Sequence, residues 1–208
     1  MQLEFSKDSN WTPSDDLKGI LRLAFDSVQR QLGLDTEPEG VIVKFAKTCD
    51  GDACTDTMLR PFLITMTEFN PFRMIVNLAH EMIHVKDLAS GKLKLIWNNG
   101  MPRMSYNGIP VPDMVLASAR VSNSDMHALP FEREAYTRMG GLAKQAIAEM
   151  PHSAVDYIIR HSQEDLRGRS YQEAIDRADA AFKTRQEKWD NALRVLLKDP
   201  LIKKTCTT

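Results

Sequence analysis

The chain has 208 residues, and its 27 basic residues are nearly balanced by 28 acidic ones. This balance gives no strongly basic stripe of the kind that binds nucleic acid, and no apolar run is long enough to span a bilayer. A chain of this length can bury a substantial core, so we expect a single domain over residues 1–208, with a core at 1–150 and a helical C-terminal extension at 151–208.

The N-terminus and the cysteines bear on the compartment. The first residues carry neither the basic segment nor the apolar segment of a secretory signal. Of the three cysteines, Cys49 and Cys54 could close a small disulfide or hold a metal ion. No other Cys or His lies nearby to complete a tetrahedral site, so free thiols in a polar loop are favoured. We therefore expect a cytoplasmic protein.

The first third of the chain predicts one helix and two strands. Thr12 and Pro13 begin a helix whose apolar residues share one face, and Gly33 ends it. Residues 41–46 and 62–67 are rich in β-branched and aromatic side chains, which is typical of strands. The polar residues 48–57 between them predict a loop. The second strand leads directly toward the next helix, so it either lies along a cleft and pairs with an extended peptide or is an ordinary sheet strand.

A buried helix follows this strand. Asn70 is a good N-cap, and Pro71 suits the first helical position, where a missing N–H costs nothing. Gly91 marks the end of the helix. Apolar residues occur almost all round it, which predicts burial: Phe72, Ile75, Val76, Leu78, Ala79, Met82, Ile83 and Val85.

This helix contains the sequence His-Glu-Met-Ile-His. His80 and His84 are four residues apart, so they share one face of the helix and can direct two imidazoles at one metal ion. Glu81 is adjacent but off that line, where a carboxylate can act as a general base toward water. The alternative is two core histidines that happen to lie one turn apart. Two buried imidazoles with a carboxylate between them are costly without a metal or other partners, which favours a zinc site.

The rest of the chain predicts a hairpin and several helices. Residues 92–97 and 104–106 are expected to be strands around the turn Asn98-Asn99-Gly100. Residues 113–128 carry little pattern. Helices are expected from Leu129 toward Met150, from Pro151 through Ile159, and from Ser170 to Lys198.

A catalytic zinc site needs a third protein ligand, because three ligands and a water complete its coordination. The residues themselves leave five downstream candidates for this role. Glu132 and Glu134 lie at the start of a helix, from which a rigid carboxylate can be directed across a cleft. The full set of candidates is His127, Glu132, Glu134, His152 and His161.

The motif together with Glu132-x-x-Ala135 resembles the gluzincin zinc metallopeptidases, whose second motif is Glu-x-x-x-Asp. The run from the strand near Phe62 through Tyr136 is similar to small metallopeptidases that tailed bacteriophages encode. The resemblance implies that Zn²⁺ is held by His80, His84 and Glu132, with Glu81 as the base. The Asp of the family falls on Tyr136, so support of a ligand histidine would come from a phenol or another group.

The expected protein is therefore an α+β, zincin-like metallopeptidase with a short sheet, an active-site helix and a mainly helical C-terminal part. It would hydrolyse a peptide bond of a protein or peptide substrate in the cytoplasm, that of the host cell if a phage encodes it. His127, Tyr106 and Tyr136 are candidates for stabilising the oxyanion, and we select His127. No nucleic-acid or membrane partner is expected. The rivals are a hydrolase of a non-peptide amide and a non-catalytic, zinc-stabilised binding protein, such as a phage structural or host-interaction factor.

Overall fold

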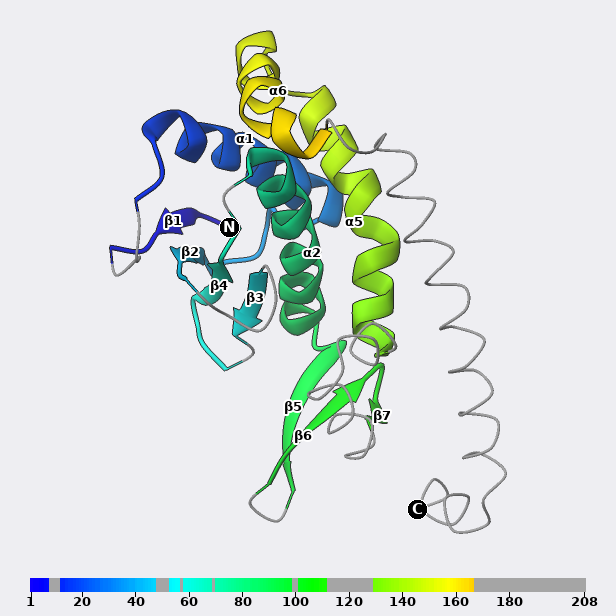
Figure 1. The fold of residues 1–208 in the computed structure, drawn as a ribbon. Coiled ribbons are helices and arrows are strands. Elements are labelled where there is room, and N and C mark those ends of the chain that lie inside the picture. The colour runs from blue at the N-terminus through cyan, green and yellow to red at the C-terminus, as the bar shows by residue number, and fades with distance from the viewer. Residues whose placement is uncertain are drawn as a thin grey trace.

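The computed structural model describes residues 1–7, 12–47, 53–56, 58–68, 70–98, 101–111 and 129–166. This part of the chain forms helices and two small sheets, which confirms the expected mixture of α and β structure (Figure 1). The helices are α1 (Asp15–Leu32), α2 (Pro71–Ala89), α5 (Pro130–Ala148) and α6 (His152–Leu166). The strands are β1 (Leu3–Phe5), β2 (Val41–Phe45), β3 (Ala53–Asp56), β4 (Phe62–Met66), β5 (Leu93–Asn98), β6 (Met101–Tyr106) and β7 (Ile109–Pro110).

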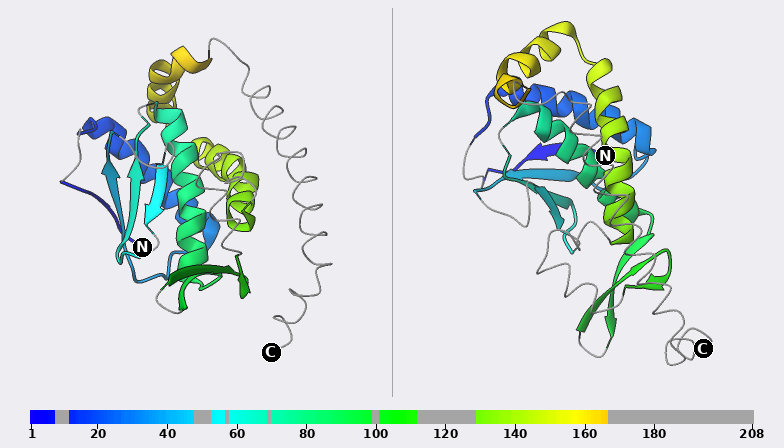
Figure 2. Two further views of the ribbon diagram at one scale, coloured as in Figure 1. Left: turned by 60° about the horizontal axis from the view of Figure 1, so that its bottom comes forward. Right: turned by 45° about the vertical axis from the view of Figure 1, so that its right-hand side comes forward.

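The larger sheet has the strand order β1-β2-β4-β3. Strands β1, β2 and β4 run parallel, whereas β3 is antiparallel to β4 and lies at the edge next to α2 (Figure 2). One expectation was wrong here, and of the two interpretations of residues 62–67 the ordinary sheet strand is the one that holds. The predicted loop at 48–57 contains β3, which escapes a pattern search because it is short and its side chains are half-exposed or exposed. The strand that precedes α2 is not available to a peptide, because β4 pairs with β2 and β3 on its two sides.

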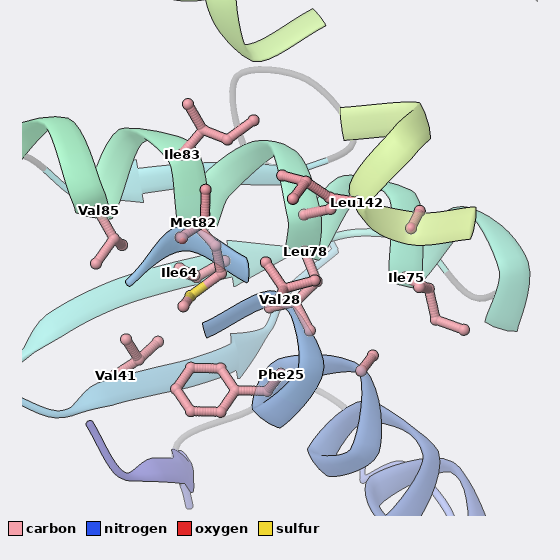
Figure 3. Packing of buried hydrophobic residues seen from close by; sticks show 14 of the residues in the cluster. Phe25, Val28, Val41, Ile64, Ile75, Leu78, Met82, Ile83, Val85 and Leu142 are labelled. Atoms are coloured by element: carbon pink, nitrogen blue, oxygen red, sulfur yellow. The ribbon is translucent and has the colours of Figure 1, made fainter. Parts of the chain in front are cut away.

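The core lies between this sheet and the helices. Val41 of β2 and Ile64 of β4 are fully buried, because alternate residues of these strands face the helices. Against them pack Phe25 from α1 and two further apolar residues from α2, Leu78 and Met82 (Figure 3). Leu142 of α5 and Ile158 of α6 belong to the same cluster, so α6 shares the core with the first 150 residues.

Helix α1 begins two residues later than the sequence pattern suggests. Ser14 is the N-cap, and its hydroxyl accepts a hydrogen bond from the N–H of Leu17. The predicted end is confirmed, because Gly33 adopts the left-handed conformation with φ of 68°.

Helix α2 begins as predicted. The side chain of Asn70 accepts hydrogen bonds from the N–H groups of Phe72 and Arg73, and Pro71 occupies the first turn. The helix ends at Ala89, just before Gly91 with φ of 70°. Thirteen of its residues are buried, so it is the central helix of the fold, as the apolar pattern indicates: Pro71, Met74, Ile75, Leu78, Ala79, His80, Glu81, Met82, Ile83, His84, Val85, Asp87 and Leu88.

The smaller sheet, in the order β5-β6-β7, lies where α2 ends and α5 begins (Figure 1). The predicted hairpin is confirmed, with Leu93 opposite Tyr106 at its base. Helix α5 runs alongside α2 in the opposite direction, and Gly140 and Gly141 lie within it without ending it. No helix among the described ranges is both long enough and apolar enough to cross a membrane. His127, Cys49, Cys206 and the predicted helix at 170–198 lie outside the described residues.

Candidate metal centre

His80 and His84 lie on the face of α2 that is turned toward α5. Both are buried, and their Nε2 atoms are 3.0 Å apart. The helical repeat places both side chains on one face, about 5–6 Å apart at Cβ, and their rotamers bring the Nε2 atoms together. The two imidazoles therefore present a pair of nitrogen atoms to one point between the helices.

Glu132 brings a third donor to that point from the first turn of α5. Its Oε2 lies 3.0 Å from Nε2 of His80, and its Oε1 lies 3.4 Å from Nε2 of His84. Pro130 begins the helix, and the N-terminal end of a helix is a favourable place for a carboxylate. Of the two glutamates considered from the sequence, Glu132 is the one that reaches the histidines.

The spacing of these donors suits a metal ion. Nitrogen or oxygen ligands about 2.0–2.1 Å from a tetrahedral Zn²⁺ lie about 3.3 Å from one another. The ligand atoms of His80, His84 and Glu132 all lie within 4.8 Å of one another, and the closest pairs are 3.0–3.4 Å apart. Two imidazole nitrogens and a carboxylate oxygen are also the donor types that zinc prefers. The residues present therefore fit a three-ligand zinc site.

The remaining ring nitrogens differ from those of most metal-binding histidines, which donate to an acceptor. Nδ1 of His80 and Nδ1 of His84 are buried, and neither has a hydrogen-bond partner among the described residues. If each Nε2 binds an ion, the proton of each neutral ring is on Nδ1, where metal-binding histidines usually donate to an acceptor. The neighbouring rings shield the site: Tyr136 stands edge-on to His80 with centroids 4.6 Å apart, and Phe131 stands edge-on to His84.

Burial and the neighbouring groups shift the pKa of His84 and of Glu132. Burial alone would lower the pKa of His84, but the hydrogen bond and the negative charge of Glu132 outweigh it and raise that pKa above the usual 6.5. Burial would raise the pKa of Glu132, yet its hydrogen bonds to His80 and His84 hold that pKa far below its usual range. Glu132 is thus a carboxylate, ready to bind a cation.

Glu81 projects from α2 toward β3. The residue is 4% exposed, and its Oε2 accepts a hydrogen bond of 2.7 Å from the hydroxyl of Thr55. Its negative charge also acts on His84, which places it near the donors without making it one of them. Sequence reasoning missed Thr55, because it placed this residue in a loop.

Glu134, the other candidate of α5, belongs to a separate polar cluster. Its carboxylate pairs with the ammonium group of Lys92 and accepts hydrogen bonds from the hydroxyl of Tyr106 at 2.6 Å and from the guanidinium of Arg138 at 3.1 Å. Burial raises the pKa of Glu134, but these donors outweigh it and lower that pKa to about 2. Lys92 also lies 3.6 Å from the buried Asp87 of α2. Through these ion pairs and hydrogen bonds, the base of the β5–β6 hairpin contacts both α2 and α5, the helices that carry the metal-binding residues.

The other predicted residues are dispersed. The hydroxyl of Tyr106 is bonded to Glu134 and so is not directed at the three donors. Burial and the Glu134 carboxylate raise the pKa of Tyr106, so it stays a neutral donor. His152 and His161 are exposed on α6 and lie outside the donor group.

Comparison of this chain with protein families, with curated proteins and with solved structures finds no match.

Proposed function

We propose that this protein is a zinc-dependent hydrolase, and specifically a metallopeptidase of the His-Glu-x-x-His type. The observation that carries the proposal is the convergence of His80, His84 and Glu132, three donors of the types zinc prefers, beside the buried carboxylate of Glu81. Two helices that are far apart in the sequence supply these groups. A core that needed only apolar packing would gain nothing from bringing them together.

The roles follow from the positions. His80, His84 and Glu132 would hold Zn²⁺, which when bound polarises a carbonyl group and lowers the pKa of water. Glu81 is the base: it accepts a proton from the attacking water and later delivers it to the leaving amine. The hydrogen bond from Thr55 holds the carboxylate of Glu81 in place. Because Glu81 points toward Thr55, its carboxylate is not one of the three metal ligands.

The edge strand β3 favours a peptide as the substrate. Its outer side has no partner strand among the described ranges, and it lies directly beside α2. An extended peptide can add to such an edge through backbone hydrogen bonds, which would lay the chain across the base. Residues 53–56, and not 62–67, are thus the strand that we propose to bind the peptide.

The arrangement of a short mixed sheet and a ligand-bearing helix is what a zincin-like domain requires, in keeping with the resemblance to gluzincins of tailed phages. One departure from that family remains consistent with the site. Tyr136, at the position of the family's Asp, packs its ring against His80 and can hold that imidazole in orientation. We propose that the enzyme acts in the cytoplasm, that of the host if a phage encodes it.

Metal analysis and a cleavage assay on the same preparations test this function. The purified parent should contain about one zinc per chain and should cleave members of a diverse peptide library, with the products identified by mass spectrometry. The matched control is Glu81→Gln, which keeps the shape of the side chain but cannot accept a proton. Stoichiometric zinc with no cleavage of peptides, but with hydrolysis of non-peptide amides, would contradict the peptidase assignment. Zinc with no hydrolysis at all would instead favour a zinc-stabilised binding protein.

A further inference from the structure

We infer that Thr55 is a positioning residue: it fixes the carboxylate of Glu81 and couples the edge strand β3 to the base. This inference builds on the proposed function, since it concerns the residue that we assign as the base. It assigns a role to a strand residue that lies outside the His-Glu-x-x-His sequence and 26 residues before Glu81.

The pairing of β3 decides which way Thr55 points. Thr55 lies opposite Ile64 and Ala53 lies opposite Met66, and both partners on β4 are buried beneath the helices. Because side chains alternate along a strand, Thr55 and Ala53 share this inner face, whereas Asp56 is exposed on the other face. A shift of one residue in the register would turn the hydroxyl of Thr55 away from α2.

The contact has the geometry of a strong hydrogen bond. The hydroxyl of Thr55 donates to Oε2 of Glu81 at 2.7 Å, which is typical of a hydroxyl bonded to a charged acceptor. The carbonyl oxygen of Glu81 is 3.5 Å from the same hydroxyl, too far to compete for its single proton. Glu81 is a buried residue, and its carboxylate needs such a donor because burial of an unpaired charge is costly.

Glu81 needs an anchor of its own. The backbone of α2 fixes where its side chain begins, but three rotatable bonds separate that point from the carboxylate. A proton acceptor has to be held to within about 0.5 Å of its working position. With Oε2 bound to Thr55, the other oxygen is directed by that bond and remains to accept a proton. Because Thr55 belongs to the edge strand, a peptide that pairs with β3 would contact the element that holds the base.

A less specific reading is that Thr55 only satisfies a buried carboxylate and contributes to stability. The two readings differ in what they predict for a folded, metal-loaded variant. If the role is structural alone, loss of the hydroxyl changes stability but leaves chemistry at the metal site unchanged. If Thr55 positions Glu81, loss of the hydroxyl weakens every process in which Glu81 accepts a proton, and serine restores it.

The experiment compares Thr55→Val, Thr55→Ala and Thr55→Ser with the parent. Valine replaces the hydroxyl by a methyl group and keeps the β-branched shape. Alanine removes the hydroxyl without adding any atom, and serine keeps the hydroxyl. The matched control is Thr137→Val, which removes an exposed hydroxyl bonded to a backbone carbonyl of α5. Zinc affinity is measured by competition with a chelator. The Co²⁺-loaded proteins are then titrated with acetohydroxamic acid, which loses a proton on binding a metal ion, and binding is followed by visible absorption.

We expect the valine and alanine variants to bind zinc within about threefold of the parent but acetohydroxamate about tenfold or more weakly, as expected for loss of one hydrogen bond to a charged group. With fluorescein-labelled casein, kcat should fall by a similar factor and KM should change little. Serine and the Thr137→Val control should match the parent. If valine disrupts the fold, alanine decides the question.

The contrary results are distinct. A zinc-loaded Thr55→Ala or Thr55→Val protein that binds acetohydroxamate as tightly as the parent overturns the positioning role and leaves the proposed function intact. A folded, zinc-loaded Thr55→Ser protein as weak as the valine variant also overturns it. A parent that binds no metal overturns the proposed function, and the positioning role with it.

Discussion

Oε2 of Glu132 lies 3.0 Å from Nε2 of His80, although 52 residues separate them in the chain. This contact joins the first turn of α5 to the middle of α2. It completes a group of three donors that the histidine pair alone leaves open.

His80→Ala should abolish stoichiometric zinc binding, because it removes one of three ligands and leaves Glu132 with a single histidine. Zinc content of the purified protein, measured by plasma mass spectrometry, tests this. His152→Ala is the matched control, since His152 is exposed on α6 and lies outside the donor group. Full zinc occupancy in His80→Ala would remove the site assignment.

Glu81→Gln should keep zinc and the fold but lose hydrolysis by several orders of magnitude, because an amide cannot accept the proton. The amide can still accept the hydrogen bond that Thr55 donates, so we expect little change in stability. Cleavage kinetics and thermal unfolding on one preparation test both parts. A variant as active as the parent would show that Glu81 is not the base.

Glu132→Ala should weaken zinc affinity by orders of magnitude, and Glu134→Ala should weaken it much less. The reason is geometric: Glu132 contacts both histidines, whereas Glu134 is bonded to Lys92 and Tyr106. Titration of zinc against a competing chelator gives the ranking. The reverse order would move the ligand to Glu134, and no effect from either substitution would point to His127.

Zinc affinity should fall as the pH is lowered, beginning above the usual pKa of histidine. Burial opposes a proton on His84, but Glu132 outweighs it, and the pKa of His84 in the metal-free protein is raised. A raised pKa means that the proton stays bound to higher pH and competes with the metal there. Chelator competition between about pH 6 and 8 should show a fall of up to about tenfold per pH unit for each displaced proton. Zinc affinity that is independent of pH in this window would contradict the raised pKa of His84.

Glu134→Gln should lower the free energy of unfolding by roughly 1–2 kcal/mol near neutral pH, through weaker bonds to Lys92 and Tyr106. The pKa of Glu134 is lowered to about 2 in the folded protein. Its stabilisation is therefore fully present above the pKa of the unfolded chain, about 4.3, and is lost as the pH falls toward 2. The difference between parent and variant in urea unfolding should shrink over this range.

The control for that measurement is Glu4→Gln, which changes an exposed glutamate on β1 and should leave the unfolding curves nearly unchanged. A difference between the parent and Glu134→Gln that stayed constant from neutral pH to pH 2 would show that the charge of Glu134 is not what stabilises the hairpin.

Much of the fold and half of the site could be predicted from the sequence because their causes are local. Asn70 and Pro71 act on the N–H groups of the next turn, and Gly33 takes a conformation that other residues avoid. His80 and His84 are placed on one face of α2 by the helical repeat. The sequence therefore determined where α2 begins and that its two imidazoles share one face.

Only the tertiary structure decided which groups meet those imidazoles. Glu132 and Glu134 are the same residue type and lie two positions apart in the sequence. Because α5 packs against α2 and the hairpin, Glu132 contacts the histidines and Glu134 contacts Lys92. Thr55 depends on the pairing of an edge strand too short to leave a pattern. Contacts between residues far apart in the chain depend on how whole helices and strands pack, and a periodic sequence pattern does not predict them.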